Sequence, residues 1–535
     1  MEKRIFLAVV LSLAVVFVFQ TFLGSSNKNA LLRTQSPIIN DVAVKSSLPT
    51  IPKTIDLSSD TSKNHPAFVP KSTIFENIQY RIESSSKGAN LDNIFLKEYN
   101  YLFPINSVVS YDIFDDLSFE PSLFENNKIR FIHKSSEWFI EKEYTLNPNY
   151  TIDLNIKLKN ISDNSKNLSI IKTNIHVNTS RLDKDNVQSN LTLLEYGIKT
   201  DKNILRKSNA VNFNEKWNKE ETVKIDWISF RDRYFAIVVQ PKEVETNYVI
   251  KFISDTQLRL GALASTIAVD PAQTIEYKYK IYAGPQKLDL LGKADKDFEK
   301  VMVFSNWGWL DAVSKFIYWL LGALHHIVSS WGICIILISL IVYGIMYPLT
   351  LKSLVSMKKL QALQPKMKEL QEKYKNNQER LSKEIMELYR VHQVNPLSGC
   401  LPMILQMPIF VGLYQVLWRS IYFRGESFLW IKDLSLPDHT FKFAGTIPFV
   451  GEYLNILPIL MTIIMFFQQK LNLKTMTTGS ADQLAQQKMM AVMFPVLIGF
   501  IFYNMASGLN LYFVVFYILS TLSQWNISRE TKVVV

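Results

Sequence analysis

The stretch Tyr343-Gly-Ile-Met-Tyr-Pro-Leu-Thr350 closes a long apolar segment, and the organisation of the rest of the chain can be worked out from it. A basic segment with helically spaced leucines follows it and ends at Asn395-Pro-Leu-Ser-Gly-Cys400, where a second apolar segment begins. A helix of about 20 apolar residues is long enough to cross the hydrocarbon core of a bilayer. The junction therefore predicts two membrane spans that are connected by a long basic loop.

The composition indicates a chain that is divided between membrane and water. Its 535 residues are 48% hydrophobic, and a mean hydropathy of +0.05 fits neither an ordinary soluble enzyme nor a wholly embedded transporter. The formal net charge is +11, and the basic excess is concentrated in particular segments between apolar runs. This distribution indicates membrane topology rather than a nucleic-acid-binding face, so no DNA partner is predicted.

Six apolar runs are long enough to be membrane helices. The first runs from Ile5 to about Leu23, and the Lys3-Arg4 pair before it gives it the pattern of a secretory signal. No Ala-x-Ala-like cleavage site follows, so an uncleaved signal anchor over residues 1–24 is favoured over a cleaved signal peptide. The other five runs cover residues 331–351, 399–421, 453–469, 489–506 and 508–526.

The charges of the loops orient these spans. The loop between the second and third spans, residues 352–394, carries ten lysines and arginines against five glutamates. Such an excess is typical of a cytoplasmic loop, and the Lys3-Arg4 pair before the first span agrees by parity. Six crossings then place both termini in the cytoplasm, including the short tail 528–535, and everything between the first and second spans outside it.

The exterior part has a linker and a β domain. Residues 25–69 are rich in Ser, Thr, Asn, Pro and Lys with a single aromatic residue, Phe68, which predicts a flexible linker. Residues 70–296 show period-two alternation without a comparably long helical pattern, which predicts an antiparallel β-sandwich. The clearest alternating positions are Ile152, Leu154, Ile156 and Leu158, and then Ile275, Tyr277, Tyr279 and Ile281.

Residues 297–330 change to a helical period. One face carries Leu310, Val313, Ile317, Leu321, Leu324 and Ile327. We expect an amphipathic helix that lies along the membrane interface, where Trp307, Trp309 and Trp319 fit an aromatic belt. The same apolar stripe would also serve as an ordinary packing face.

The cytoplasmic loop predicts a helical hairpin, because two apolar stripes at helical spacing flank a turn at Asn376-Asn377. The stripes consist of Leu360, Leu363, Met367, Leu370 and Tyr374 in the first helix, and Leu381, Ile385, Leu388 and Tyr389 in the second. They must bury against each other, the bilayer or a partner. Packing within the hairpin, with a solvated basic face, and contact with a partner are both consistent with the pattern.

The ordered motifs from residue 331 to about residue 526 resemble the core of the YidC/Oxa/Alb family of membrane protein insertases. They are Leu363-Gln-Pro-Lys366, Gln406-Met-Pro-Ile-Phe410, Ile456-Leu-Pro-Ile-Leu460, Met465-Phe-Phe467 and Ser507-Gly-Leu-Asn-Leu-Tyr512. The β domain resembles, by position and strand pattern, the periplasmic supersandwich of the Gram-negative type. The implied fold class is a membrane α-helical bundle of six spans, five of which (331–527) form the insertase core, plus an all-β periplasmic domain.

The resemblance also implies a function and a location. Such proteins reside in the bacterial inner membrane, where they insert and help to fold membrane proteins, alone or beside the Sec translocon. Their groove is open to cytoplasm and lipid and needs no cofactor. The implied partners are nascent membrane proteins, lipid, the Sec translocon, and a ribosome or targeting factor that meets the hairpin, including Lys366.

Polar side chains within the spans are the candidates for the groove, because an uncompensated polar group in hydrocarbon is costly. They are Ser339, Gln406, Asn504, Asn510 and Tyr512. The resemblance places Ser339 and Gln406 on the groove wall, although hydrogen bonds that join helices would explain them too. Helix capping is the stronger interpretation for Asn504 and Asn510, and Tyr512 also fits an aromatic belt.

Tyr343 is the one departure from the family pattern. An ungapped alignment of Ile341-Val-Tyr343-Gly344 with the motif puts this tyrosine where the family usually has a groove arginine. A phenol is neutral at pH 7 and cannot hold a carboxylate by two charge-assisted hydrogen bonds. We therefore hypothesise that the groove acts by hydration and favours weakly charged substrates.

Enzyme and transporter functions are the alternatives. The sequence has no His-Glu-x-x-His, no phosphate-binding glycine loop and no nucleophile elbow, so no catalytic or metal-binding residue is predicted. A carbohydrate-acting β domain would need paired carboxylates or histidine in a cleft. A secondary transporter would show internal repeats and ionisable residues at the midplane of its spans. The two cysteines, Cys334 and Cys400, lie toward opposite membrane faces by our assignment, which excludes a disulfide framework.

Overall fold

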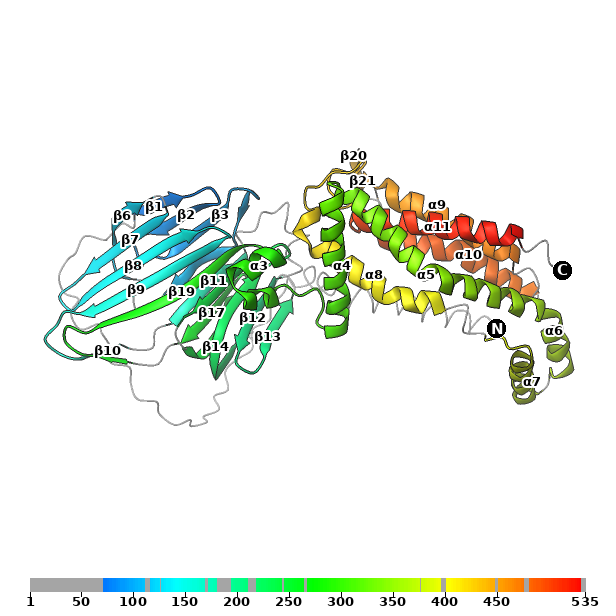
Figure 1. Cartoon of the computed structure of the whole chain (residues 1–535), viewed down its shortest axis with the longest axis horizontal. Coiled ribbons are helices and arrows are strands. Elements are labelled where there is room, and N and C mark those ends of the chain that lie inside the picture. Colours follow the sequence, from blue (N-terminus) through cyan, green and yellow to red (C-terminus); the bar gives the residue numbers. More distant parts are fainter. Residues whose placement is uncertain are drawn as a thin grey trace, which may run out of the picture. The chain divides into compact units, whose positions relative to one another are not determined.

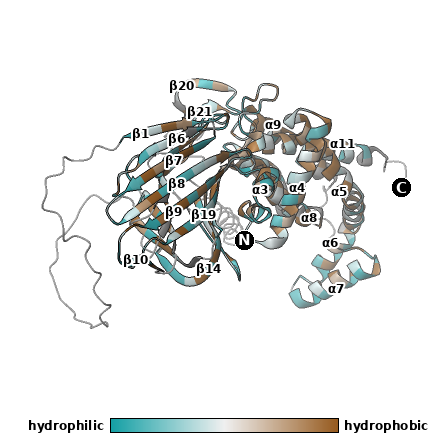
Figure 2. Cartoon of the chain, turned by 60° about the vertical axis from the view of Figure 1, so that its left-hand side comes forward, coloured by the Kyte–Doolittle hydropathy of each residue, from teal (hydrophilic) through white to brown (hydrophobic). Residues whose placement is uncertain are grey.

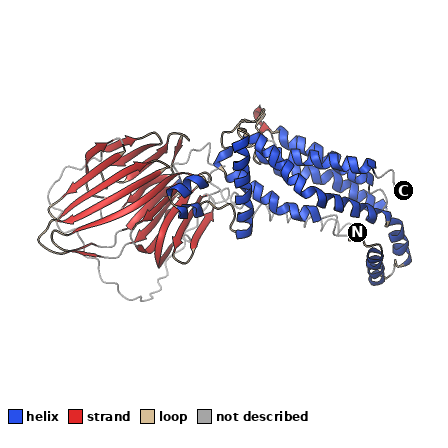
Figure 3. Cartoon of the chain, in the orientation of Figure 1, coloured by secondary structure: helices blue, strands red, loops and turns tan. Residues whose placement is uncertain are grey.

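The computed structural model divides the chain into two compact units, Met1–Val301 and Met302–Val535, which are considered separately. It describes residues 71–110, 116–125, 127–168, 172–179, 194–209, 218–242, 245–263, 267–375, 377–395, 401–447, 451–475 and 481–530. The predicted signal anchor and linker, residues 1–69, and the last five residues of the predicted tail lie outside this range. Figure 1 shows the elements, and Figure 3 shows that strands make up most of the first unit and helices most of the second.

The first unit is the predicted β domain, and every strand pair in it is antiparallel. One series of strands runs β6 (Glu120–Glu125), β7 (Lys128–Lys134), β8 (Trp138–Asn147), β9 (Thr151–Asn160), β19 (Thr274–Pro285), β15 (Phe235–Pro241), β14 (Lys219–Arg231), β12 (Leu194–Thr200) and β13 (Ile204–Asn209). Antiparallel order and a polar outer face suit a sequence that alternates at period two.

A second series ends on the same strand β14. It runs β1 (Ser72–Glu76), β2 (Tyr80–Ser85), β3 (Leu91–Leu96), β5 (Ile105–Ser110), β11 (Lys172–Asn178), β17 (Gln257–Leu263) and β16 (Glu245–Ser254). The first half of β14 pairs with β16, and its second half pairs with β12 and β15, with a register shift between Thr222 and Ile225. Strand β14 therefore joins the two series.

Short elements complete this unit. Strand β4 (Tyr101–Leu102) pairs with β3, and β10 (Lys166–Leu168) pairs with β18 (Ile267–Val269). Helix α3 (Leu288–Ala294) and the 3-10 helix η4 (Lys296–Val301) follow β19. Phe298 of η4 is fully buried, and the centre of its ring lies 6.4 Å from that of Tyr282.

The core of the β domain follows the alternation seen in the sequence. Figure 2 shows hydrophobic and hydrophilic residues alternating along the strands. The four alternating positions of β9, Ile152 to Leu158, are buried, and so are Tyr277, Tyr279 and Ile281 of β19. Each β8–β9–β19 register pairs these buried positions across the sheet. The all-β prediction for this part of the chain is confirmed.

Charged groups are also buried in this domain. The Glu195 carboxylate on β12 accepts hydrogen bonds from Nε (3.0 Å) and from a terminal nitrogen (2.8 Å) of Arg231 on β14. Arg231 also donates to the side chain of Gln286 at 3.0 Å, beyond the end of β19. Gln286 in turn donates to the backbone oxygen of Asp232 at 2.8 Å. The network fixes three segments that are far apart in sequence.

The second unit contains the helices of the expected core. They are α4 (Gly308–Ile327), α5 (Trp331–Ala362), α6 (Gln364–Lys373), α7 (Gln378–Val391), α8 (Leu401–Arg419), the 3-10 helix η6 (Ile421–Phe423), α9 (Ile456–Thr475), α10 (Ala481–Phe502) and α11 (Ser507–Glu530). A small hairpin of β20 (Phe441–Ile447) and β21 (Gly451–Leu454) lies between α8 and α9. Helix α11 packs against α5, α8 and α9, and α10 packs against α9.

The six-span arrangement stays a prediction. Among the described residues, one helical stretch, Trp331–Ser356, is long and apolar enough to cross a membrane, and shorter apolar stretches occur at Ile456–Leu471 and Lys488–Phe502. Helix α5 does not end at residue 351 as expected but continues to Ala362, with Pro348 inside it. The helical leucine spacing of the basic loop continues the span directly, and proline is tolerated in membrane helices.

Helix α4 has two faces with different surroundings. Leu310, Ile317 and Leu321 of the predicted stripe are buried, and a side chain at Gly412 of α8 would meet Ile317 at 3.2 Å. This part of the stripe thus packs within the unit, in line with the alternative of a packing face, whereas Ile327 at the end of the stripe is exposed. Trp309 and Trp319 are exposed on the same helix, and an interfacial position for this face remains a prediction.

The buried ion pair gives a stability prediction. Replacing Glu195 with alanine leaves the Arg231 guanidinium in the interior without the carboxylate that accepts two of its hydrogen bonds. We expect the unfolding free energy of the β domain to fall by about 3–5 kcal/mol, read from hydrogen exchange of the β12 and β14 amides in the full chain.

The matched control is Glu137→Ala. Glu137 pairs with Lys166 at 2.6 Å, and its side chain is 42% exposed. An exposed pair contributes about 1 kcal/mol or less. An equal fall in the unfolding free energy of the two variants would contradict a larger contribution of the buried Glu195–Arg231 pair.

Candidate functional site

The candidate site consists of polar side chains among the apolar helices of the second unit. Of the residues assigned to the groove from the sequence, including Tyr343 at the family's arginine position, Ser339, Tyr343, Asn510 and Tyr512 are buried, and Gln406 is half-buried. They come from α5, α8 and α11, and α11 packs against both other helices. Because buried polar groups normally form hydrogen bonds, the partner of each side chain shows whether it joins helices or leaves an atom open for a substrate.

Gln406 and Tyr512 form a direct pair. The side-chain nitrogen of Gln406 on α8 donates to the hydroxyl oxygen of Tyr512 on α11 at 2.7 Å. Tyr512 is fully buried, and the amide oxygen of Gln406 is buried with no hydrogen-bond donor among the described residues. The pair joins two helices, and it leaves an acceptor that a substrate or water can use.

Tyr343 lies near Tyr512, because the ring of Phe516 contacts both side chains. The rings of Tyr343 and Phe516 are 5.6 Å apart and nearly perpendicular, and those of Tyr512 and Phe516 are 6.0 Å apart and stacked. Tyr347 lies on the other side of Tyr343 with a ring distance of 6.0 Å. The departure from the family pattern therefore adjoins the Gln406–Tyr512 pair, and both are held by the ring of Phe516.

A second aromatic group frames the pair. Phe410 on α8, Phe502 on α10 and Phe513 on α11 have ring distances of 5.1 to 6.0 Å from one another. Phe513 also meets Tyr512 at 5.1 Å. Edge-to-face and tilted contacts at these distances stabilise the packing beyond area alone. This ring cluster from three helices thus packs against Tyr512 of the polar pair through Phe513.

Ser339 and Asn510 donate hydrogen bonds locally, and the side-chain oxygen of Asn510 has no donor among the described residues. The Ser339 hydroxyl donates to the backbone oxygen of Ile335 in its own helix at 2.7 Å. The Asn510 side chain donates to the backbone oxygens of Phe502 (3.2 Å) and Met505 (3.4 Å), where α10 ends. The Asn510 contacts are those of a cap, which the sequence favoured for this residue. Asn504 is exposed.

Two further glutamines within the helices were not singled out from the sequence. Gln468 on α9 donates to the hydroxyl of Ser520 on α11 at 2.7 Å, and Gln415 on α8 is buried. Both glutamines lie in or at the end of predicted spans, so the cost of a polar residue in hydrocarbon was a usable signal.

The connection between α8 and α9 carries another unpredicted group. The buried Asp438 carboxylate accepts hydrogen bonds from the backbone nitrogens of Ile456 (2.7 Å) and Leu457 (3.0 Å) at the start of α9. A carboxylate there satisfies free N–H groups and complements the helix dipole. Asp438 lies 18 residues before the start of α9. Sequence rules for helix capping consider only residues next to the helix end, so they did not predict this contact.

The predicted hairpin forms from α6 and α7. The Tyr389 hydroxyl donates to the sulfur of Met367 at 3.4 Å, and Lys366 lies 3.3 Å from His392. Leu363 is buried, Lys366 is exposed, and the remaining predicted contact residues are half-buried: Met367, Leu370, Tyr374, Leu381, Ile385 and Leu388. The stripes face each other in part, and their role toward a partner stays a prediction.

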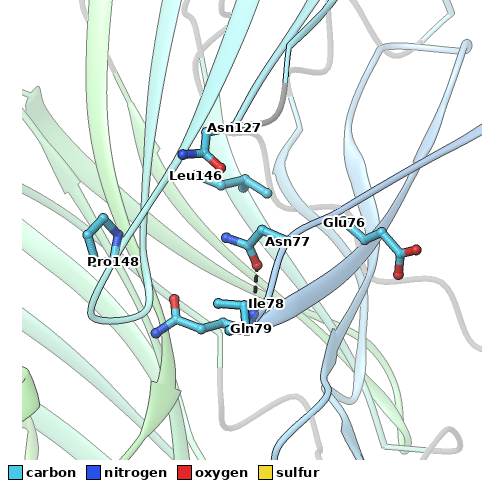
Figure 4. Close-up of a pocket in the computed structure, with 7 residues that line it drawn as sticks. All are labelled: Glu76, Asn77, Ile78, Gln79, Asn127, Leu146 and Pro148. Atoms are coloured by element: carbon cyan, nitrogen blue, oxygen red, sulfur yellow. Dashed lines mark hydrogen bonds between the residues drawn. The ribbon is translucent and has the colours of Figure 1, made fainter.

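A pocket of about 490 Å³ lies in the β domain (Figure 4), lined by Glu76, Asn77, Ile78, Gln79, Asn127, Leu146 and Pro148. The carboxylate of Glu76 pairs with Lys97 at 2.7 Å, and this hydrogen bond lowers the pKa of Glu76. The Asn77 side chain accepts from the backbone of Gln79 and Tyr80. With one carboxylate, already paired, these lining residues lack the pair that glycoside hydrolysis uses.

Comparison with known proteins extends over most of the chain. A family model described as 60Kd inner membrane protein matches residues 323–533, and one described as YidC periplasmic domain matches residues 123–320. The membrane protein insertase YidC of Chlorobaculum tepidum is 36% identical over 324 residues, which are 59% of this chain and 54% of that protein. The membrane protein insertase YidC of Geotalea daltonii is 29% identical, and the alignment covers 99% of both chains.

The extent of these matches differs. The chain spans about half of the length of the Chlorobaculum relative, 54%, but nearly all of the Geotalea relative. A crystal structure described as active YidC insertase with its first transmembrane domain resolved is 19% identical, covers 86% of this chain and 93% of that chain, and has a TM-score of 0.37. A structural likeness at that level carries no argument by itself.

The family assignment rests on the two models together, which run from residue 123 to residue 533 and leave out only residues 321 and 322 between them. The named relatives are insertases, not enzymes, which also speaks against the carbohydrate-enzyme alternative. The second unit supplies the ordered helices and the first unit the β domain that these models describe. The chain belongs to the YidC family of inner membrane proteins with a periplasmic domain.

Proposed function

We propose that this chain is a membrane protein insertase and chaperone whose substrates are nascent proteins of the inner membrane. The observation that carries the proposal is the Gln406–Tyr512 pair at 2.7 Å, with Tyr343 beside it, among helices that are mostly apolar. The names of the relatives support the same activity. The secondary-transporter alternative has no comparable support.

The chemistry of the polar cluster suits the passage of a hydrophilic segment. A polar group that enters hydrocarbon without a partner costs several kcal/mol. The buried amide oxygen of Gln406 and the hydroxyl of Tyr512 offer it hydrogen bonds within the membrane. Water held at the same groups would shorten the apolar path that the segment must cross.

The direction of insertion comes from the substrate. Apolar surface that leaves water for lipid gains about 25 cal/mol per Å². A substrate helix of about 20 apolar residues therefore has a large driving force of its own. The insertase lowers the barrier and needs neither a nucleotide nor a cofactor for this step.

The proposed topology has six spans, both termini in the cytoplasm and the β domain in the periplasm. The basic excess of residues 352–394 supports a cytoplasmic hairpin. Exposed basic residues on α6 and α7, including Lys366, and exposed apolar side chains such as Met386 and Val391 suit contact with a ribosome, a targeting factor or the Sec translocon. The domain boundaries proposed from the sequence follow from this topology.

The first experiment measures insertion. The purified full chain in liposomes should protect a short single-span protein from protease, compared with empty liposomes. Replacing Gln406 with leucine and Tyr512 with phenylalanine removes the polar pair, and a barrier raised by about 1–2 kcal/mol slows insertion about 5–30-fold. Thr521→Val is the matched control, because the Thr521 hydroxyl donates within α11 to Tyr517 at 2.7 Å.

Three outcomes are informative. Insertion that falls in the double variant but not in Thr521→Val supports the polar cluster as the substrate path. Equal insertion in all variants keeps the insertase and removes the cluster from its mechanism. Insertion no better than in empty liposomes contradicts an activity that is independent of a translocon.

Tyr343 gives a prediction about substrate charge. Tyr343→Arg places a permanent positive charge beside the cluster, and a charge-assisted hydrogen bond contributes about 1.5–3 kcal/mol. Insertion of an acidic-tailed substrate should rise on the order of tenfold, while a neutral-tailed substrate serves as the internal control. Unchanged insertion of the acidic substrate would refute the hypothesis that the native groove selects weakly charged tails.

The pair itself can be measured by a double-mutant cycle. Gln406→Leu, Tyr512→Phe and their combination should show a coupling of about 0.6–1.7 kcal/mol, the range for hydrogen bonds between membrane helices. The readout is the unfolding equilibrium of the full chain in bilayers. A coupling near zero would mean that the two side chains do not share a hydrogen bond in the membrane.

A further inference from the structure

A tight turn in the connection between α8 and α9 carries two exposed apolar side chains. The backbone nitrogen of Phe428 donates to the oxygen of Ile431 at 2.9 Å, and the nitrogen of Ile431 donates to the oxygen of Phe428 at 2.9 Å. The two bonds close a loop whose tip consists of Leu429 and Trp430, with exposed fractions of 73% and 43%. This four-residue segment, 428–431, is called the tip turn below.

The backbone of the tip turn is unfavourable for the residue that occupies it. Leu429 has a φ of +53°, in a region that glycine adopts freely and that a branched side chain seldom adopts. Two-residue hairpin loops usually place glycine or asparagine at such a position. A large apolar residue that is both strained and exposed contributes nothing to the core, so a role for its side chain outside the core is indicated.

The tip turn is fixed against the start of the apolar helix α5. A side chain added at Gly332 would meet the ring of Phe428 at 2.1 Å, so this ring lies directly on the first turn of α5. Phe423 and Trp331 form a perpendicular ring contact at 5.3 Å, and Ile431 is buried. The Phe428 ring thus holds the tip turn at the end of the helix that is long enough to cross a membrane, and Phe423 holds the segment before the turn at the same helix end.

The same connection holds the start of α11. The Ser507 hydroxyl donates to the backbone oxygen of Asp433 at 2.9 Å, and the backbone nitrogen of Gly508 donates to the oxygen of Leu434 at 2.9 Å. Because two helix ends share this connection, the tip turn has little freedom along the helix axes. If α5 crosses a bilayer, the tip turn lies at the level where hydrocarbon meets the headgroups.

Its side chains have the chemistry of that level. Tryptophan is enriched where membrane meets water, since the ring is apolar and the N–H is polar. Leucine gains from entry into the acyl region, and the exposed Lys432 next to the tip turn suits anionic headgroups. Position, strain and side-chain type agree on a lipid surface as the partner.

We propose that Leu429 and Trp430 form a membrane anchor that inserts into the leaflet at the end of the bundle where α5 and α11 begin. The anchor holds the connection that clamps both helix ends, so it keeps this end of the bundle seated in the leaflet. The inference rests on the proposed function in one respect, namely that α5 crosses the bilayer.

The test is a depth measurement on the full chain in liposomes of zwitterionic and anionic lipid. Cysteines at positions 429, 78 and 345 (Leu429→Cys, Ile78→Cys, Ile345→Cys), in a chain with Cys334→Ala and Cys400→Ala, carry a spin label, and its collisions with oxygen and with a water-soluble nickel complex report depth. Ile78 is a matched control because it is apolar, 90% exposed and in the β domain, and Ile345 is 69% exposed on α5. We expect the label at 429 about 5–10 Å below the headgroup level and the label at 78 in water.

The outcomes separate the anchor from the proposed function. A label at 345 in hydrocarbon with a label at 429 in water overturns the anchor alone. A label at 345 in water overturns the membrane-spanning helix and with it the basis of the proposed function. A label at 429 that enters only when a second membrane protein is present would identify a protein partner and overturn the lipid anchor.

A second variant guards against a local folding defect. Leu429→Gly suits the positive φ, so it preserves the turn while it removes the apolar side chain. A label at position 430 (Trp430→Cys) should then move outward from its depth in the otherwise unchanged chain, whereas Leu429→Met should leave the depth as it was. Equal depth in the glycine and methionine variants would overturn the role of Leu429.

Discussion

The second unit depends on one constraint, the cost of a polar group that is buried among apolar helices without a partner. Some polar side chains there donate hydrogen bonds locally: Ser339 bonds within its helix, and the side-chain nitrogen of Asn510 bonds to the carbonyls that end α10. The amide of Gln406 meets this cost only by reaching Tyr512 on another helix, and one of its atoms remains without a donor among the described residues. An acceptor left open in an apolar surrounding can bind a polar guest. Asn510 and Gln415 also have such an oxygen, and Gln406 differs from them by its hydrogen bond to Tyr512 with Tyr343 nearby, which makes this point the candidate for substrate contact.

In the β domain, the buried polar groups that need partners are charged, and they pair with each other. Glu195 and Arg231 are buried, but each hydrogen bond between them is short and well directed, and Gln286 links the pair to the end of β19. A buried ion pair adds little net stability over apolar packing, yet its loss on one side is costly. Here it joins β12, the end of β14 and the residue after β19, so it ties together three segments of the first strand series.

The sequence was sufficient for patterns that repeat and insufficient for contacts between distant segments. Period two in β9 and β19 predicted a β domain, and helical spacing predicted the hairpin, because burial on one face imposes those periods directly. The candidate residues Gln406 and Tyr512 followed from the cost of polarity, but 106 residues separate them, and no local rule pairs them. The contact of Asp438 with the start of α9 and that of Phe428 with Gly332 could not be predicted for the same reason.

These long-range contacts gather at one end of the bundle. Asp438 caps α9, Asn510 meets the end of α10, and the backbone at Asp433 and Leu434 holds the start of α11. At the opposite end, α5 runs on without interruption into the exposed helices α6 and α7. A bundle whose helix ends are tied at one side can part at the other without losing its register. Under the function proposed above, a substrate would enter from the hairpin side while the tied end stays closed, which is the asymmetry that one-directional insertion requires.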